Sequence, residues 1–181
     1  RLRNILTTNY AKDSTMNDFG KHVIPAYLES GENVIAYRFD GYWKDVGTID
    51  SLWEANMEFL NPEMALDIRD KDWRIYSRNN ISPPHFIAET GSAKESLIAD
   101  GCYVAGEIND SILSDDVQIK EAAKITDSVI MSGATIGKNV ILNRAIIGEN
   151  AILGDGAILD GTDEIAVVGY SEVIGVTIDE D

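Results

Sequence analysis

The sequence predicts an α/β segment over residues 1–60 followed by a second domain over residues 96–181, in which a solenoid of short parallel β-strands runs to about residue 160 and a C-terminal tail follows. The main observation is that residues 109–113 recur as 126–130 and again as 143–147, at a step of seventeen residues. A repeat of this length cannot bury its own apolar face, so successive repeats must stack to form a core. The second observation is that residues 1–60 instead show helix and strand patterns of ordinary length.

A finer alternation within each repeat predicts the strands themselves. Every five or six residues, a small or aliphatic residue is followed two positions later by an aliphatic one. The first members of these pairs are Val117, Ala123, Ser128, Ala134, Val140, Ala145, Ala151 and Ala157. Period-two alternation indicates short strands with one buried face. Three strands per repeat would close a triangular coil, with corners at 137–139, 148–150 and 154–156, where Gly and Asn tolerate positive φ. An earlier coil, from Ser96 through Val104, is two residues shorter.

Composition narrows the class of function. The formal net charge of −16 argues against nucleic acid or an anionic membrane as a partner. The same charge fits poorly with a complete triphosphate site, which usually needs Lys or Arg at the phosphates.

The single cysteine, Cys102, occupies an apolar position, so we expect a core thiol and a reducing, cytoplasmic location. The sequence has no run of eighteen apolar residues and no secretory signal pattern. It begins at Arg1 rather than Met, so we expect part of a longer protein.

The N-terminal region reads in order as helix, strand and helix. Residues 23–28 suit a short helix, and the β-branched and aromatic run 34–39 suits a strand. Apolar residues at helical spacing over 50–60 predict a second helix, capped by Thr48 or Asp50. Prolines and polar residues mark 61–95 as a linker, with one short extended piece at 73–76. A final apolar run at 165–169 could cap the end of the solenoid.

Asp45 is the sharpest candidate for chemistry. It lies just beyond the predicted strand, between the bulky Trp43 and the flexible Gly47. Ligands of α/β folds gather at the carboxyl ends of strands, and a carboxylate there can hold Mg²⁺ that keeps its waters and phosphate ligands. The alternative from the residues alone is a loop aspartate that forms an Asx turn or caps the next helix.

A resemblance to a known family favours the metal interpretation. The motifs are 18–21 (Asp-Phe-Gly-Lys), Ile24-Pro25, 41–48 (Gly-Tyr-Trp-Lys-Asp-Val-Gly-Thr) and 52–56 (Leu-Trp-Glu-Ala-Asn). Residues 73–78, two prolines at 83–84 and the solenoid follow in the same order. Over residues 1–160 the chain resembles the bacterial glucose-1-phosphate adenylyltransferases (ADP-glucose pyrophosphorylases).

The resemblance implies a fold and a reaction. The solenoid would be a left-handed parallel β-helix built from hexapeptide repeats, and residues 1–60 the remnant of a nucleotidyltransferase domain. The reaction would convert ATP and α-glucose-1-phosphate to ADP-glucose and pyrophosphate, for glycogen synthesis. Asp45 would be the catalytic, Mg²⁺-binding aspartate, and Trp43 and Gly47 would lie at the substrate pocket. Asp18 and Lys21 are weaker candidates near that site.

The resemblance also assigns a role to the β-helix. In that family the β-helix supports a tetramer and contributes effector sites. Lys138 and Arg144, two of the few basic residues of the later coils, are the candidates here for binding an anionic effector.

The family's phosphate loop, its first metal-binding aspartate and its Glu-Lys pair for the sugar phosphate would all precede Arg1. We therefore expect these 181 residues alone to be inactive. The alternatives are a non-catalytic regulatory or assembly subunit, and a relative that uses another nucleotide such as UTP or GTP. Catalysis by the solenoid itself, as in hexapeptide acyltransferases or β-helical zinc enzymes, is disfavoured. It needs His residues at the coils, and His22 and His85 both precede the first predicted coil.

Overall fold

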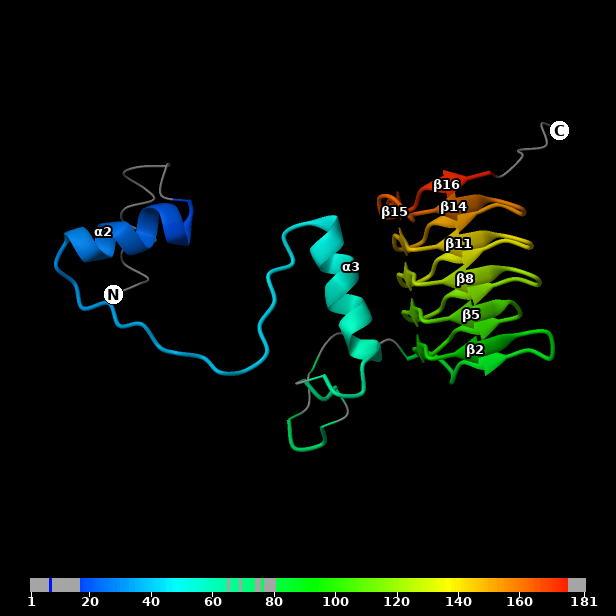
Figure 1. The fold of residues 1–181 in the computed structure, drawn as a ribbon, viewed down its shortest axis with the longest axis horizontal. Coiled ribbons are helices and arrows are strands. Elements are labelled where there is room, and N and C mark those ends of the chain that lie inside the picture. The colour runs from blue at the N-terminus through cyan, green and yellow to red at the C-terminus, as the bar shows by residue number, and fades with distance from the viewer. Residues whose placement is uncertain are drawn as a thin grey trace. The chain divides into compact units, whose positions relative to one another are not determined.

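A computed structural model describes residues 7, 17–64, 66–68, 70–73, 76 and 81–175 (Figure 1). These form two compact units, divided between Gly41 and Tyr42. The extended piece expected at 73–76 lies partly outside the described residues. No helix in the described ranges is long and apolar enough to cross a membrane.

The first unit contains one short helical segment. A π-helical turn, η1 (Phe19–Val23), runs into α2 (Ile24–Glu29), which confirms the helix predicted at 23–28. Asp18 begins it, because its Oδ1 accepts a hydrogen bond of 2.7 Å from the backbone N–H of Lys21. The strand predicted at 34–39 is wrong: these residues have no regular secondary structure, and Tyr37 is 87% exposed. A strand needs a backbone partner, and none of the described residues pairs with this segment.

The second predicted helix is present as α3 (Ile49–Met57), extended by a 3-10 turn, η2 (Glu58–Leu60). Thr48 is its N-cap, as predicted. The Thr48 side chain accepts from the Ser51 backbone N–H at 3.2 Å, and the Ser51 hydroxyl accepts from the Thr48 N–H at 3.0 Å. This reciprocal capping box satisfies two backbone donors that the first turn of a helix leaves unpaired.

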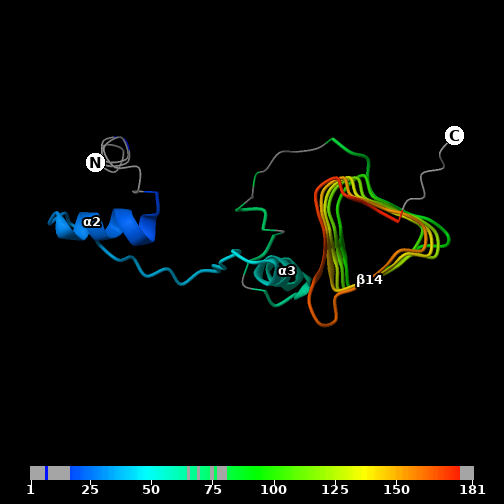
Figure 2. The ribbon, with the colours of Figure 1, turned by 90° about the horizontal axis from the view of Figure 1, so that it is seen from above.

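Residues 86–174 form a parallel β-helix with three sheets, in the part of the chain that the structure describes. The first sheet runs β1 (Phe86–Ile87), β4 (Tyr103–Val104), β7 (Gln118–Ile119), β10 (Thr135–Ile136), β13 (Ile152–Leu153) and β16 (Val173–Ile174). The second runs β2 (Ser92–Lys94), β5 (Glu107–Asn109), β8 (Lys124–Thr126), β11 (Ile141–Asn143) and β14 (Ile158–Asp160). The third runs β3 (Leu97–Ile98), β6 (Ile112–Leu113), β9 (Val129–Ile130), β12 (Ala145–Ile147) and β15 (Ala166–Val168). Viewed along its axis, the coil is triangular, as predicted (Figure 2).

The register confirms the seventeen-residue step in the regular coils. Val129 pairs with Ile112 and Ile146 pairs with Val129, each seventeen residues on. The earlier coil is two residues shorter, as expected, because Glu107 pairs with Ser92 at a step of fifteen. The shortening falls at the corner that contains Gly106, where a Cβ would lie 2.6 Å from the carbonyl oxygen of Ala123. Only glycine allows this close approach.

The β-helix begins earlier than the sequence suggested. Strands β1 and β2 lie inside the stretch 61–95 that the sequence marked as a linker, and Phe86 pairs with Tyr103. The run at 165–169 does add a strand, β15, followed by β16 at the end of the described coils.

The core lies inside the triangle. The aliphatic residues of successive coils are fully buried there: Ile108, Leu113, Ile119, Ile125, Ile130, Ile136, Leu142, Ile147 and Leu153. Cys102 is also buried, and burial raises the pKa of its thiol, which fits the predicted core role.

Buried Ser128 accepts a hydrogen bond from the backbone N–H of Ala145 at 3.1 Å and donates one to the carbonyl of Thr126 at 2.7 Å. Its side chain therefore satisfies backbone groups at a corner where the strand ladder is interrupted.

The predicted corners have the expected backbone. The third residue of each is left-handed: φ is 56° at Asn139, 57° at Asn150 and 76° at Gly156. Another corner stacks Asp110, Asp127 and Arg144, all at φ of 46–50°. Left-handed residues turn the chain sharply, so one such position closes each of these corners.

Candidate functional site

The candidate catalytic residues lie in the segment that joins the start of the second unit to α3. Trp43 is 75% exposed, and Asp45 and Gly47 are exposed as well. A Cβ on Gly47 would lie 3.6 Å from Oδ1 of Asp45, so Gly47 leaves open the space beside that carboxylate. The three residues proposed for metal and substrate are neighbours in the sequence, and the structure leaves all three exposed.

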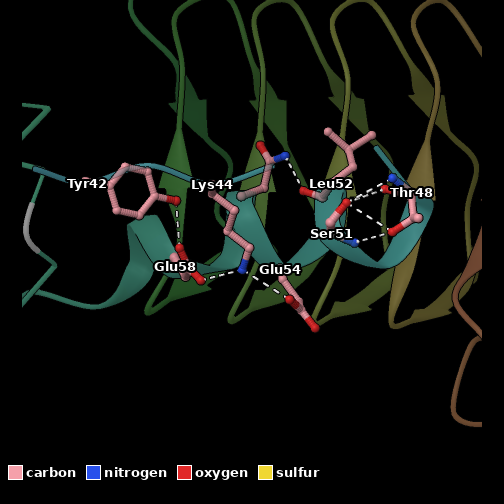
Figure 3. Close-up of polar contacts among 8 residues, drawn as sticks. Tyr42, Lys44, Thr48, Ser51, Leu52, Glu54 and Glu58 are labelled. Atoms are coloured by element: carbon pink, nitrogen blue, oxygen red, sulfur yellow. Dashed lines mark hydrogen bonds and ion pairs between the residues drawn. The ribbon is translucent and has the colours of Figure 1, made fainter. Parts of the chain in front are cut away.

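Tyr42 and Lys44, which alternate with the exposed residues of this segment, contact α3 and η2 (Figure 3). Nζ of Lys44 lies 2.5 Å from Oε1 of Glu58 and 3.1 Å from Oε2 of Glu54. The Tyr42 hydroxyl donates to Oε2 of Glu58 at 2.7 Å. We call Tyr42, Lys44, Glu54 and Glu58 the Lys44 network.

Electrostatics within the Lys44 network favour the charged forms of its ion pair. The hydrogen bonds from Lys44 and Tyr42 lower the pKa of Glu58, and those to Glu58 and Glu54 raise the pKa of Lys44. The hydrogen bond to the Glu58 carboxylate also raises the pKa of Tyr42, which therefore stays protonated and remains a donor. At neutral pH the network holds one cation between two carboxylates.

Another side of α3 packs on the β-helix. Leu52, Trp53 and Met57 contact an apolar cluster formed by Val129, Ile146 and Ile165. The indole Nε1 of Trp53 donates a hydrogen bond of 2.7 Å to the backbone carbonyl of Asp127. This contact fixes α3 to the corner of the coil.

The two candidate effector residues both have partners within the chain. The guanidinium of Arg144 lies 5.1 Å from the ring centroid of Trp53 and donates to the carbonyl of Thr162 at 3.2 Å. Nζ of Lys138 lies 2.6 Å from Oε2 of Glu121, which raises the pKa of that lysine. An anion binding at either cation must therefore compete with contacts that already exist.

The chemistry of Asp45 fits a magnesium ligand. Its carboxylate is a hard oxygen donor on an exposed segment, and Mg²⁺ is commonly held by one or two carboxylates while it keeps water and phosphate ligands. Within the described ranges, no group of three His, Cys, Asp or Glu could hold a metal by itself. Asp45 would thus supply one protein ligand of a site completed by the phosphates of a substrate.

Sequence reasoning missed the residues that hold this segment in place. Lys44, Glu54 and Glu58 form a network, and Trp53 docks the helix. One signal was present: Glu54 and Glu58 are four residues apart, so they lie on one face of a helix and attract a cation.

Two family models match the chain. Residues 83–175, just over half of the chain, match the model described as "GlmU-like, C-terminal hexapeptide". Residues 2–62 match the model described as "Nucleotidyl transferase". The second match contains the whole 42–48 segment and α3, and the first contains all sixteen strands of the part of the chain that the structure describes. The expectation of a partial nucleotidyltransferase region followed by a hexapeptide β-helix is confirmed.

Proposed function

We infer the function from the family: the chain belongs to the GlmU-like, C-terminal hexapeptide family, and it joins that β-helix to a nucleotidyl transferase region. Together these parts make it a sugar-phosphate nucleotidyltransferase with a hexapeptide β-helix. We propose more specifically that the polypeptide containing these residues makes ADP-glucose and pyrophosphate from ATP and α-glucose-1-phosphate. Support for this choice comes from the order of motifs between Asp18 and Asn56.

The observation on which the proposal rests is the placement of Asp45. Its carboxylate is exposed beside Gly47 and Trp43, and the Lys44 network fastens the adjoining residue to α3. An aspartate whose only role were to cap α3 would direct its side chain at the first helical turn, but Thr48 already fills that role. Asp45 is therefore available for a ligand.

The proposed reaction is an in-line displacement at phosphorus. A phosphate oxygen of glucose-1-phosphate forms a bond to the α-phosphorus of ATP. The bond from that phosphorus to the bridging oxygen of the β-phosphate breaks, and pyrophosphate leaves with the electron pair. Bound Mg²⁺ would neutralise charge on the phosphate oxygens. In this scheme Asp45 binds the ion, and Trp43 offers an exposed ring face against which a sugar or base can pack.

For the β-helix we propose assembly and regulation. Its apolar sheets could support a homotetramer, and Lys138 and Arg144 remain proposed contacts for an anionic effector. Two alternatives stay open for the activity: a non-catalytic regulatory subunit, and a transferase for another nucleotide. The presence of Asp45 favours the catalytic subunit over the regulatory one.

The test is pyrophosphate release by the native polypeptide that contains residues 1–181. It is assayed with Mg²⁺, α-glucose-1-phosphate and ATP, UTP, GTP or CTP in turn, beside Asp45→Asn and a control, Asp40→Asn. Asp40 is also exposed and is paired only at the surface, with Arg38 at 3.0 Å. Release with ATP that falls at least a hundredfold in Asp45→Asn, but not in Asp40→Asn, would support the proposal.

Two results would count against it. Release with another nucleotide and none with ATP would show that the other nucleotide is the substrate. No release with any nucleotide would favour the regulatory subunit.

A further inference from the structure

The segment before α3 has two faces with different surroundings. Tyr42 and Lys44 contact the helix, and the Lys44 side chain is only 22% exposed. Trp43 and Asp45 alternate with them and are exposed (Figure 3 shows the Tyr42 and Lys44 side chains against the helix). Side chains of an extended chain alternate in direction, so fixing Lys44 on one face determines where Asp45 lies on the other.

Lys44 has a specific electrostatic partner in the helix. Glu54 and Glu58 stand one turn apart, and like charges at this spacing repel. Glu58 also follows the last residue of α3, where the helix dipole disfavours a negative charge. The ammonium group of Lys44, at 3.1 Å from Glu54 and 2.5 Å from Glu58, offsets both effects. The attraction is therefore directed at one point of α3 rather than spread over its surface.

The other end of the segment is fixed as well. Thr48 caps α3 through reciprocal hydrogen bonds with Ser51. Only three residues, Asp45, Val46 and Gly47, separate the Lys44 contact from this cap. The helix itself is held on the β-helix by Trp53. Asp45 thus lies in a short span between two anchored points.

We propose that Lys44 is a positioning residue for Asp45. Through its ion pairs with Glu54 and Glu58, it holds the span 45–47 in the arrangement that presents the Asp45 carboxylate to Mg²⁺ and the substrate phosphates. That Lys44 holds the span 45–47 in place rests on the contacts alone. That this arrangement presents Asp45 to Mg²⁺ and phosphates rests on the proposed function. Lys44 does not touch substrate or metal in this scheme.

The experiment uses Lys44→Met, which keeps most of the aliphatic stem and removes the charge, and Lys44→Arg, which restores a cation. Glu58→Gln removes the charge from the other side and keeps an oxygen that can accept from Tyr42. The matched control is Lys94→Met, since Lys94 is an exposed β-helix lysine with one exposed acidic neighbour, Glu95, at 3.7 Å.

The first readout is amide hydrogen exchange of the 181-residue chain without metal. We expect Lys44→Met and Glu58→Gln to speed exchange of the Thr48 amide, which donates a hydrogen bond to the Ser51 hydroxyl, at least fivefold and to leave the β-helix strands unchanged. Lys44→Arg should stay within twofold of the wild type. This readout needs no catalytic activity.

The second readout is the Mg²⁺ concentration that gives half-maximal activity of the native polypeptide. Loss of residues that orient a metal ligand typically costs about 10- to 100-fold. Because Lys44 acts on Asp45 through the backbone, we expect the lower end of this range. The Mg²⁺ concentration for half-maximal activity should rise about tenfold in Lys44→Met and return toward the wild-type value in Lys44→Arg. The KM for the sugar phosphate should change less than the Mg²⁺ requirement.

Each outcome decides something different. Exchange of the Thr48 amide that stays within twofold of the wild type in both Lys44→Met and Glu58→Gln would overturn the proposal, as would equal effects in Lys94→Met. Faster exchange without any change in the Mg²⁺ requirement of an active enzyme would reduce Lys44 to a structural residue, and so would also overturn it. An inactive wild type would refute the proposed function, while the exchange data would still test the contact between Lys44 and α3.

Discussion

Replacing Trp53 with alanine tests whether the β-helix holds α3 in place. The indole is partly buried against Val129 and Ile146, donates a hydrogen bond to the Asp127 carbonyl and stacks with Arg144. A helix of nine residues is shorter than the ~12–15 at which isolated helices become even marginally stable in water. The order of α3 therefore depends on this contact.

The magnitude follows from the interactions lost. Partial burial makes the packing loss smaller than the ~3–5 kcal/mol of a buried Trp→Ala change. The hydrogen bond contributes about 1 kcal/mol and the cation–π contact about 0.5–1 kcal/mol. We expect the free energy for undocking α3 to fall by about 2–3 kcal/mol. At ~1.4 kcal/mol per factor of ten, amides of α3 should exchange roughly 30- to 140-fold faster.

Hydrogen exchange followed by mass spectrometry measures this directly. Trp53→Phe keeps a ring in the cluster and loses the N–H donor, so its effect should be about tenfold. Trp73→Ala is the control, because Trp73 is 72% exposed. Exchange of α3 within threefold of the wild type in Trp53→Ala would refute the reasoning. So would an equal acceleration throughout the β-helix strands, which would indicate global destabilisation instead of undocking.

Three further predictions concern the β-helix. Ser128→Ala leaves the buried N–H of Ala145 without its acceptor, and should lower the free energy of unfolding in denaturant by about 1–3 kcal/mol; no loss would contradict the role of the serine. Ile130→Ala should cost about 2–5 kcal/mol, while Ile141→Ala, which is 45% exposed, should cost clearly less; similar losses would contradict the assigned core. Burial, together with the Asp110 charge, raises the pKa of Asp127, so its ionised form destabilises the fold above that pKa. Asp127→Asn should therefore raise the melting temperature slightly at pH 7, with a gain that shrinks as the native carboxyl takes up its proton and vanishes below the ordinary pKa of an aspartate, where the unfolded chain is protonated too; a gain independent of pH would refute this account.

The solenoid was predictable because its signal is repeated. Each coil places an aliphatic residue such as Ile119, Ile136 or Leu153 at the same position, so a seventeen-residue step sets the register many times over. Strand β1 was missed because Phe86 follows two prolines and belongs to the first coil, where no earlier repeat supports it. The segment 34–39 had strand propensity, but propensity supplies no pairing partner.

The candidate site was predictable only in part. The resemblance pointed to Asp45, Trp43 and Gly47, whose roles stay predictions; the structure adds that all three are exposed. The contacts of Lys44 with Glu58 and of Trp53 with Asp127 depend on how a helix faces a neighbouring chain segment and a β-helix corner. The spacing of hydrophobic residues determines which side of a helix is apolar. It does not determine which backbone carbonyl the indole of a tryptophan on that helix will reach.

One corner of the β-helix is longer than the others. Ala166 pairs with Ala145 at a step of twenty-one, whereas Ile158 pairs with Ile141 at seventeen, so four extra residues lie at 161–164 (the loop projecting from the triangle in Figure 2). The strands on either side keep their pairing, because each coil contacts only its neighbours. Ile165, which follows the added residues, joins the apolar cluster that receives α3. Chain length at a corner can therefore change in evolution or by engineering while the core stays intact, so the surface that binds α3 can be remodelled separately from the scaffold that supports it.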